Sequence, residues 1–511
     1  MAVMSSSVMY ITPTTILAGG ALAALVFYLV VRGRRTRRWN HPPGPPEWPV
    51  FGSVFSLLFT KLQQHEILFQ WSATYGGIFS FTMLGTRVVV LSDEKLIRET
   101  LQDPYVSDKI PFPACETILG RPNTGIAFAS GSVFKEQQRF FLTVFRKVNS
   151  SVIKFEEIIA SQVLRFLEEM ESYGGKSFNP TDLVTVSVSN VIIKIVTGKT
   201  YSFDDPDFLR IAACSDRLSE IIGPAGLLGM ISWLASLPLP AKEELTDLMR
   251  TMLGFIRQHV DEHKASFSPD EPATDFISCY LIEMARRSKV PDDESTFDEI
   301  NLLQTCWDAI FPGFETSIST LRWTYHLLAS HPELQARVRR EISDVVGSDR
   351  LPTFADRHNL PLTEATIAES MRLRPVIPYV APHVASRDRK IAGYDVPAGT
   401  RVTINLWYVA RSPALWDEPD KFRPERFLDQ EGCFDRSLEP VLFSYGQRAC
   451  PGEQLARMEL FLFVTFVLQR FSLRLPAGAS TELGGRMGAT FRPEQFELEA
   501  VNEAPYVAAC Q

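Results

Sequence analysis

Most of the chain has apolar residues spaced three to four positions apart, which is typical of α-helices. The spacing is clearest in FKEQQRFFLTVFRKV, residues 134–148, and in LLQTCWDAIFPGFETSISTLRWTYHLLASH, residues 302–331. Two other stretches are rich in β-branched and aromatic residues on both sides of a turn signal. These are GIFSFTMLGTRVVVLSD, with Gly85-Thr86, and KIAGYDVPAGTRVTINLW, with Pro397-Ala398-Gly399. Each predicts a β-hairpin, so the expected fold is mainly α with small β-sheets, of the α+β class.

The N-terminal segment has a different pattern. TPTTILAGGALAALVFYLVV, residues 12–31, carries no charge and is long enough to span a bilayer. Arginines follow it instead of preceding it, which favours an uncleaved anchor with the body of the protein in the cytosol. We therefore expect an anchor with a basic flank over 1–38, a stiff proline-rich linker over 39–50 and one large domain over 51–511.

A second uncharged stretch, IIGPAGLLGMISWLASLPLP at residues 221–240, has two interpretations. It is either buried core or a surface loop that dips into the bilayer, and the sequence does not choose between them.

Composition and charge narrow the functional classes. The chain has 511 residues, 45% of them hydrophobic, and a net charge of −8. The acidic balance argues against a nucleic-acid partner. The seven cysteines form no C-x-x-C pair, which argues against a structural zinc site or a disulfide framework and favours a reducing compartment.

One cysteine lies among turn-forming residues, in FSYGQRACPG at 443–452. Pro451 suits the first position of a helix, so Cys450 should lie at a helix N-terminus, where backbone N–H groups and the helix dipole favour the thiolate. Gly446 and Gly452 would let a flat ligand approach the backbone, and Arg448 could pair with a carboxylate of that ligand. Taken alone, Cys450 would be interpreted as a small buried hydrophobe, as most free cysteines are.

The ten-residue stretch resembles the haem-binding loop of the cytochrome P-450 superfamily. The pattern F-x-x-G-x-R-x-C-x-G is met by Phe443, Gly446, Arg448, Cys450 and Gly452. The resemblance covers roughly residues 40 to 500. It implies the cytochrome P-450 fold, with Cys450 as the axial thiolate ligand of the iron of haem b and Arg448 on a haem propionate.

The oxygen-activation motif of that family resembles PGFETS, residues 312–317. The resemblance implies that Thr316 hydrogen-bonds dioxygen and that Glu315 relays protons. Without the cysteine loop, the same two residues would be read as an acidic residue and a threonine facing solvent.

A structural charged cluster is implied by two further segments. Glu369 and Arg372 lie three residues apart in EATIAESMRLRP and share a helix face, and FRPERF supplies Arg426. The resemblance implies that the three side chains meet in the interior, whereas E-x-x-R alone would indicate an exposed helix pair.

Two positions depart from the family's usual pattern. Phe134 and Gln138 stand where W-x-x-x-R is usual in the helix over one propionate, which removes an indole donor and a guanidinium. Pro312 stands where alanine or glycine is usual, and we expect it to restrict access to the pocket over the iron.

The substrate pocket and a second propionate contact are also placed by resemblance. His383 would bind a propionate, although a buried structural histidine is the alternative. The pocket residues are expected to be Phe112, Asp308, Pro312, Ile377 and Val380. Asp308 could accept a hydrogen bond from a substrate hydroxyl or be capped by backbone groups away from the pocket. The mostly apolar set favours a neutral lipophilic substrate, and the similarity of some segments to steroid hydroxylases favours a steroid over a fatty acid or an aromatic xenobiotic.

The resemblance implies a monooxygenase of the endoplasmic reticulum membrane, single-pass and facing the cytosol. Electrons would come from NADPH through a separate cytochrome P-450 reductase, with cytochrome b5 as a further possible partner. Two alternatives stay open at this point. One is a haem-thiolate isomerase or dehydratase acting on a lipid peroxide, and the other is a haem-binding protein without enzymatic activity.

Overall fold

The structure is a computed structural model that describes residues 39–49, 51–58, 60–147, 154–225, 240–290 and 295–503, with single positions at 20 and 22. The expected anchor over 12–31, its basic flank and most of the uncharged stretch 221–240 lie outside the described residues. Within the described ranges, no helix is both long and apolar enough to cross a membrane.

The described chain is mostly helical, as expected. The helices are α2 (Val54–Leu58), α3 (Gln64–Tyr75), α4 (Glu94–Gln102), α5 (Pro113–Leu119), α6 (Gly131–Lys147), α7 (Phe155–Ser172), α8 (Thr181–Thr197), α9 (Pro206–Ala225), α10 (Pro240–Ser266), α11 (Phe276–Arg287), α12 (Glu299–Ser330), α13 (Pro332–Val345), α14 (Pro361–Leu373), α15 (Leu406–Arg411) and α16 (Glu453–Arg470). The short 3₁₀ helices are η1 (Pro104–Val106), η4 (Phe354–Asn359), η5 (Pro424–Phe427), η6 (Arg436–Leu438) and η7 (Gly446–Arg448).

The strands are short. They are β1 (Ile78–Met83), β2 (Thr86–Leu91), β3 (Asp108–Lys109), β4 (Ser177–Phe178), β5 (His383–Val384), β6 (Arg389–Ile391), β7 (Tyr394–Val396), β8 (Arg401–Ile404), β9 (Phe471–Arg474), β10 (Gly485–Met487), β11 (Phe491–Pro493) and β12 (Leu498–Asn502).

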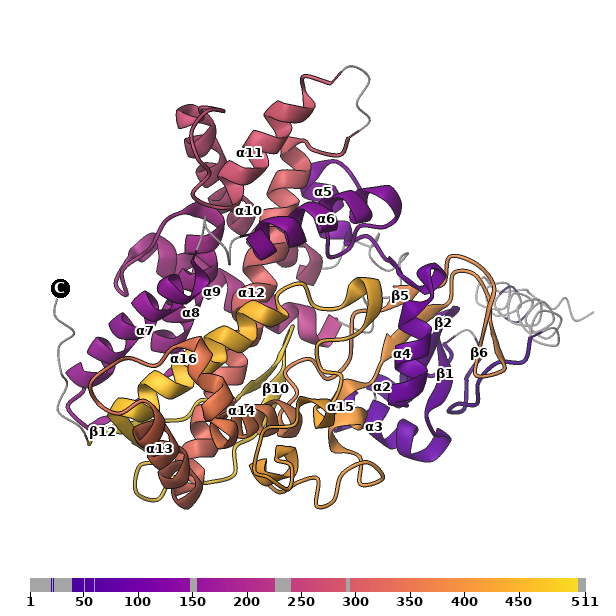
Figure 1. The fold of residues 1–511 in the computed structure, drawn as a ribbon. Helices are drawn as coiled ribbons and strands as arrows, with labels where there is room; N and C mark the ends of the chain where they lie inside the picture. Colours follow the sequence, from indigo (N-terminus) through magenta and orange to yellow (C-terminus); the bar gives the residue numbers. More distant parts are fainter. Residues whose placement is uncertain are drawn as a thin grey trace, which may run out of the picture.

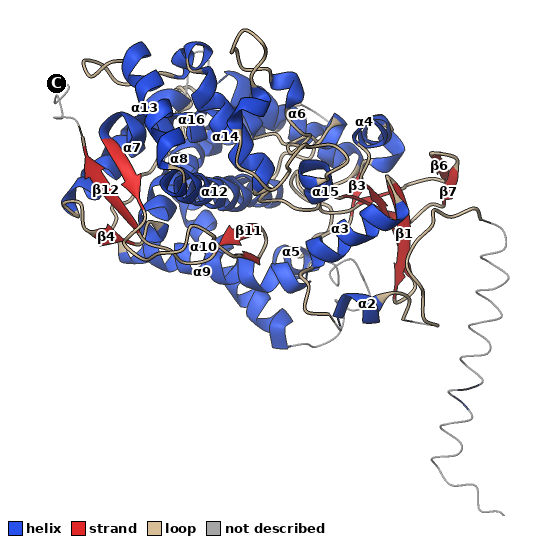
Figure 2. Ribbon diagram, turned by 90° about the horizontal axis from the view of Figure 1, so that it is seen from below, coloured by secondary structure: helices blue, strands red, loops and turns tan. Residues whose placement is uncertain are grey.

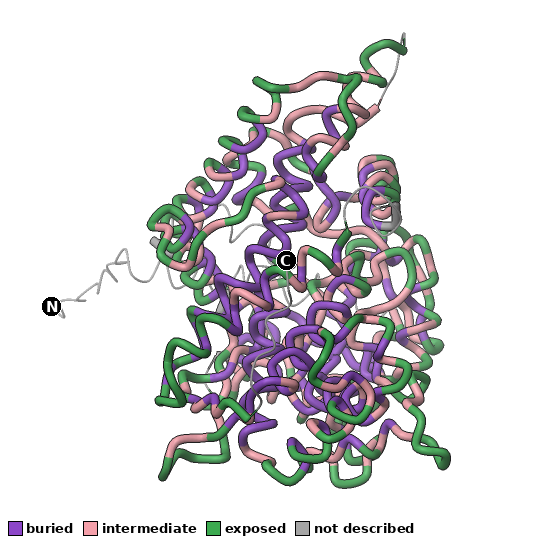
Figure 3. Tube along the Cα trace, turned by 60° about the vertical axis from the view of Figure 1, so that its left-hand side comes forward, coloured by how far each residue is buried: buried purple, intermediate pink, exposed green. Residues whose placement is uncertain are grey.

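Helix α12 forms the centre of the helical part. Figures 1 and 2 show it surrounded by the other helices, and it packs against α8, α10, α14 and α16. Its start is fixed by Asp298, whose carboxylate accepts a hydrogen bond from the Asn301 N–H. Its apolar side chains point in every direction, as in a helix that is enclosed on all sides. Buried positions accordingly gather in the middle of the molecule in Figure 3.

The largest sheet has the order β1-β2-β8-β5-β3 and lies at one side of the molecule, with α3 and α4 beside it (Figure 1). Strands β1 and β2 are antiparallel and pair Met83 with Thr86. The hairpin predicted here is confirmed, but its turn lies one residue earlier than the predicted Gly85-Thr86. Its two-residue turn is Leu84-Gly85, with φ of 44° and 85°, and this left-handed geometry matches the strand twist.

The second predicted hairpin is wrong in its turn. Pro397-Ala398-Gly399 joins β7 to β8, but β8 pairs with β2 and β5 instead of β7. The hairpin is β6–β7, and its turn is Ala392-Gly393, with φ of 47° and 82°. Pro397 begins the connection from the β6–β7 sheet to the five-stranded sheet. Strand β8 pairs in the larger sheet, where most of its side chains are buried.

Candidate active site

The loop that contains Cys450 closes tightly before α16. The Cys450 N–H donates to the carbonyl of Phe443 at 2.8 Å, and α16 begins at Glu453. The sequence predicted Pro451 at the first position of the helix, but Pro451 lies two residues before α16, whose N-cap is Gly452. The side chain of Cys450 is accessible, yet protein atoms surround it on most sides. This burial raises the pKa of its thiol to about 11. The backbone N–H groups of Gly452 and Glu453 lower that pKa, but burial outweighs them.

The two glycines of the loop have different surroundings. A Cβ on Gly446 would lie 2.2 Å from the carbonyl oxygen of Leu101, and its φ is +71°. Gly446 is therefore required by the close approach of α4. A Cβ on Gly452 would lie 4.0 Å from the sulfur of Cys450, which is ordinary contact.

Arg448 ties the loop to two other segments. Its Nε donates to the carbonyl of Ser107 at 2.8 Å and its Nη1 to the carbonyl of Ile126 at 3.0 Å, while Nη2 donates to Ala129. The guanidinium stacks on the ring of Phe134 with 3.3 Å to the ring centroid. Burial lowers the pKa of Arg448 to about 10, so it stays charged at neutral pH.

Three basic groups meet around Arg448. His383 is 1% exposed, and neither ring nitrogen has a hydrogen-bond partner of ordinary geometry among the described residues. Burial holds the pKa of His383 well below its usual range, and the charges of Lys109 and Arg448 add to this effect. Burial and Arg448 also lower the pKa of Lys109 to about 7. Such a cluster suits an anionic ligand. Burial deprives the basic groups of water, and the carboxylates of a ligand would stabilise their protonated forms in its place.

Lys109 was missed by the sequence analysis. Its Nζ donates to the carbonyl of Ala381 at 2.5 Å, and its strand β3 pairs with β5, where Lys109 lies opposite His383. No motif marks Lys109, since its position depends on the pairing of segments 274 residues apart (109 and 383).

Gln138 contacts the cysteine loop from α6. Its Nε2 donates to the carbonyl of Gln447 at 2.6 Å. At the position where the resemblance implies an arginine, this side chain therefore holds α6 against the loop through a neutral hydrogen bond.

Asp308 on α12 is capped by backbone groups. One carboxylate oxygen accepts hydrogen bonds from the N–H groups of Ile126 at 2.7 Å and Ala127 at 2.9 Å, and the other accepts one from Gln304 at 2.8 Å. Burial raises the pKa of Asp308 to about 6 despite these donors. A Cβ on Gly125 would lie 2.4 Å from the carboxylate, so the loop is pressed against it. The arrangement corresponds to the capped alternative for Asp308.

Glu315 and Thr316 lie at the middle of α12 with different environments. Glu315 is 4% exposed, and burial raises the pKa of its carboxyl to about 7. Thr316 is half-buried and donates to the carbonyl of Pro312 at 2.9 Å. Pro312 is exposed although it lies inside the central helix.

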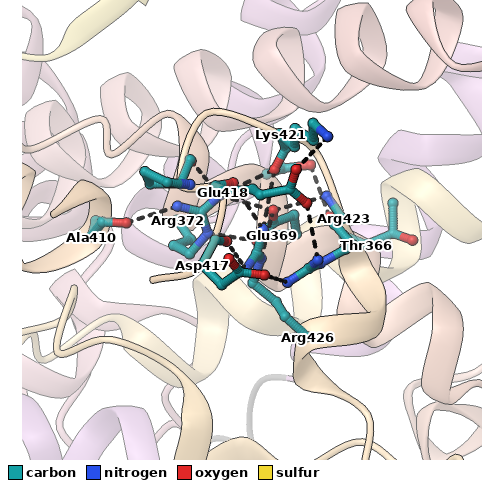
Figure 4. A network of polar contacts seen from close by, with 11 residues as sticks. Thr366, Glu369, Arg372, Ala410, Asp417, Glu418, Lys421, Arg423 and Arg426 are labelled. Atoms are coloured by element: carbon teal, nitrogen blue, oxygen red, sulfur yellow. Dashed lines mark hydrogen bonds and ion pairs between the residues drawn. The ribbon is translucent and has the colours of Figure 1, made fainter. Parts of the chain in front are cut away.

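Glu369, Arg372 and Arg426 are brought together (Figure 4). Arg372 binds both carboxylate oxygens of Glu369, at 2.6 Å and 2.9 Å, and Arg426 binds one at 3.0 Å. Glu369 and Arg372 are completely buried. Arg372 also donates to the carbonyls of Ala410 and Pro419, so the charges are enclosed in a network of hydrogen bonds.

The remaining expected pocket residues are partly buried apolar side chains. Phe112 precedes α5 and stacks on Phe128, with ring centroids 5.4 Å apart. Ile377 and Val380 pack against the core around the large sheet, and the N–H of Val380 donates to the carbonyl of Ile404 at 3.1 Å.

Comparison with known proteins agrees with this geometry. The family description "Cytochrome P450" matches residues 42–500. The chain belongs to the cytochrome P450 family. It is 32% identical to cytochrome P450 2U1 of Bos taurus, over 94% of this chain and 93% of that protein. It is 34% identical to cytochrome P450 2J5 of Mus musculus, with 94% and 95% covered, and 33% identical to cytochrome P450 18a1 of Drosophila melanogaster, with 94% and 89% covered.

Membership of the cytochrome P450 family confirms several expectations. The protein is a monooxygenase of the oxidoreductase class that uses haem b, dioxygen and electrons derived from NADPH. The residues present fit haem for two reasons. The accessible thiol of Cys450 could bind the iron. Lys109, His383 and Arg448 form a basic cluster beside it that suits the two propionates.

Proposed function

We propose that this cytochrome P450 oxidises a neutral lipophilic substrate, with a steroid favoured over a fatty acid or an aromatic xenobiotic. The main observation in favour of this proposal is the position of the Cys450 thiol. It lies deep in the fold, and its sulfur accepts hydrogen bonds from the backbone N–H groups of Gly452 and Glu453. Cys450 would hold the haem iron, in the loop that contains Phe443, Gly446 and Gly452. Cys450 would hold the iron as its thiolate, since a coordinating thiol gives up its proton in spite of a high pKa in the free protein.

The haem, when bound, supplies dioxygen activation that a thiolate ligand favours. The chain's residues bind and orient it. Arg448, His383 and Lys109 would hold its propionates, and Phe134 keeps the Arg448 guanidinium in place by stacking. Thr316 would hold a proton at its hydroxyl, and Glu315 would supply that proton, since a carboxyl with a pKa near 7 exchanges protons readily at neutral pH.

The substrate class rests on the side chains expected around the pocket. Phe112, Pro312, Ile377 and Val380 are apolar, and Asp308 has its oxygens occupied by Gln304 and the backbone of Ile126 and Ala127. Few polar groups therefore remain to recognise a charged or strongly polar substrate, which supports a lipophilic one. The preference for a steroid rests on the resemblance of the segments around Glu369 and Tyr394.

We infer further that residues 12–31 anchor the protein in the endoplasmic reticulum membrane as a single span, with residues 39–50 as linker and 51–511 as the catalytic domain facing the cytosol. The charge distribution after residue 31 supports that orientation. Electrons would then come from an NADPH-dependent cytochrome P-450 reductase in the same membrane, with cytochrome b5 as a second donor.

The first test is the absorption spectrum of the purified protein, reduced with dithionite and exposed to carbon monoxide. We expect the strongly red-shifted Soret band of a thiolate ligand and its loss in Cys450→Ala. The band should be retained in Cys433→Ala, the same change at an exposed cysteine elsewhere in the chain. A band at the shorter wavelength of a thiol or histidine ligand in the unmodified protein would contradict ligation by Cys450 thiolate.

The second test is turnover with reductase and NADPH on a steroid, a fatty acid and an aromatic compound of similar size. Product that requires NADPH and contains one atom from labelled dioxygen is expected, at the highest kcat/KM for the steroid. Turnover of a lipid hydroperoxide without NADPH would favour an isomerase or dehydratase. Haem binding without substrate-dependent use of NADPH would favour a non-enzymatic role.

A further inference from the structure

The hydrogen-bond partners of Glu315 come from α9 and from the turn between β10 and β11. Ser219 on α9 donates to Oε2 of Glu315 at 3.1 Å, and Thr490 in the turn donates to the same oxygen at 3.3 Å. Ser215, also on α9, reaches Oε1 at 3.5 Å. The hydroxyl of Thr316 is instead used on the carbonyl of Pro312. The acid is therefore held by two other elements of the fold and not by its neighbour in the motif.

The direction of the hydrogen bond from Ser219 is fixed by a third group. The backbone N–H of Ala489 donates to Oγ of Ser219 at 3.0 Å. An N–H group can only donate, so this hydroxyl accepts from Ala489 and its own proton is left for Glu315. Ser219 is completely buried, and a Cβ on Gly488 would come within 2.7 Å of its Oγ. The turn and α9 therefore meet closely enough to fix the hydroxyl by packing.

An ion pair connects this region to the surface. Nη1 of Arg492 on β11 lies 3.0 Å from Oδ1 of Asp216 on α9, and the Asp216 side chain is 53% exposed. Ser219 and Asp216 are three residues apart, and Thr490 and Arg492 are two apart, so the ion pair and the two hydroxyls are carried by the same two elements. Asp216 is thus a point where solvent reaches the elements that hold Glu315.

The charged groups in this region come from β11, α9, α12 and α8. Arg492 on β11 lowers the pKa of Glu315 and Asp216 on α9 raises it, although burial is the largest influence. Arg322 lies seven residues after Glu315 on the same face of α12. Burial lowers the pKa of Arg322 to about 10 and Arg492 adds to this, whereas the charges of Asp216, Glu315 and Asp182 on α8 oppose it. With a pKa of about 7, Glu315 is populated in both protonation states at neutral pH.

We propose that Ser219 and Thr490 are positioning residues that hold the Glu315 carboxyl on the side of the Asp216–Arg492 pair, so that Glu315 takes protons from solvent on that side. This inference rests on the proposed role of Glu315 as the acid that supplies Thr316. In each cycle, water near Asp216 would give a proton to the Glu315 carboxylate, the neutral acid would release it toward Thr316, and the carboxylate would be restored.

The test is an infrared titration of the haem-loaded protein, in which the C=O stretch of protonated Glu315 is assigned by its loss in Glu315→Gln. Thr490→Val has nearly the same shape as threonine but no hydroxyl, and Thr490→Ser keeps the hydroxyl. Because each hydroxyl stabilises the carboxylate, we expect the Glu315 midpoint to rise by about one pH unit in Thr490→Val and in Ser219→Ala. The midpoint should stay unchanged in Thr490→Ser.

Ser189→Ala is the matched control for Ser219→Ala. Ser189 on α8 is 2% exposed, and its hydroxyl has no hydrogen-bond partner among the described residues. We expect no change in the Glu315 midpoint in this variant. An unchanged midpoint in both Ser219→Ala and Thr490→Val, or an equal rise in Ser189→Ala, would overturn the proposal.

The pH profile of kcat, measured with reductase and saturating substrate, connects the positions to catalysis. In Thr490→Val we expect the profile to move in the same direction as the infrared midpoint, with KM unchanged and a larger share of the electrons recovered as hydrogen peroxide. A profile that does not move would overturn the assignment of Ser219 and Thr490 to proton supply. Full activity in Glu315→Gln would instead contradict the proposed catalytic role of Glu315, so the two failures can be told apart.

Discussion

The guanidinium of Arg448 lies over the ring of Phe134, with 3.3 Å between its central carbon and the ring centroid. Phe134 stands at the position where the resemblance of this segment to the family's motif implies a tryptophan. The phenyl ring preserves the aromatic face beneath the guanidinium but has no N–H group to donate. The contact therefore retains the stacking part of the arrangement and loses the hydrogen-bonding part.

Removal of the ring should weaken the hold on haem. We expect Phe134→Ala to lose haem about five- to tenfold faster, since a stack of this kind contributes ~1 kcal/mol or slightly more. Phe134→Trp should slow the loss by adding a donor. The measurement is the rate of haem transfer to an excess of a scavenging apoprotein. Phe203→Ala, which removes the stack of Arg165 on Phe203 elsewhere in the fold, is the control and should leave the rate unchanged.

Lys109 should contribute to haem retention through its charge. Its pKa of about 7 reflects burial beside Arg448, and a bound carboxylate would restore the charged form. We expect Lys109→Gln to accelerate haem transfer at pH 6.5 and Lys109→Arg to retain the slow rate. Equal rates for the glutamine and arginine variants would show that the charge at this position does not act on haem.

The cluster of Glu369, Arg372 and Arg426 should be essential for stability. Glu369→Gln would leave two buried guanidinium groups without a counter-charge, at a cost on the order of 3–5 kcal/mol in the free energy of unfolding. Glu418→Gln is the control, because Glu418 pairs with Lys421 and Arg423 at the surface and should cost less than about 1 kcal/mol. Urea unfolding of both variants measures the difference, and similar midpoints would contradict the prediction.

Asp308 should make stability depend on pH. Burial raises the pKa of its carboxyl to about 6 in the folded protein, from an ordinary value of 3.8 in the unfolded chain. The folded state therefore binds this proton more tightly. The contribution of Asp308 to stability is therefore largest below pH 4 and is lost as the pH rises through about 6. Asp308→Asn removes this dependence, and its amide can donate to Oε1 of Gln304, which has no partner among the described residues.

We accordingly expect the stability of Asp308→Asn relative to the unmodified protein to increase between pH 5 and pH 7.5, by on the order of 1 kcal/mol. Chemical denaturation at the two pH values measures it. Parallel stability curves for the two proteins would show that the carboxyl is not perturbed.

Pro312 should limit both stability and pocket width. Pro312→Ala restores an N–H group that can donate to the carbonyl of Asp308, so the free energy of unfolding should rise by up to ~3 kcal/mol. It also removes ring atoms from an accessible face of α12, so wider substrates should bind more tightly. Absorbance shifts over a series of substrates of increasing width measure this, with Pro332→Ala at the start of α13 as control. An unchanged order of affinities would contradict a restricting role.

The sequence by itself determined the features that depend on neighbouring residues. The spacing of apolar residues predicted α12, and the alternation around Gly85 predicted the β1–β2 hairpin. The motif around Cys450 indicated the family before any fold was considered, because its fixed positions lie within ten residues. Glu369 and Arg372 were expected on one helix face, since three residues separate them.

Only the tertiary structure decided the features that depend on distant segments. Lys109 meets His383 through strand pairing, and Glu315 receives Ser219 and Thr490 from elements 96 and 175 residues away. The turn at Ala392-Gly393 replaced the expected one because β8 is paired in another sheet. Periodicity and turn signals report local conformation, whereas the partners of a buried charge are chosen by how the elements pack, so the electrostatics of the site were decided by the fold.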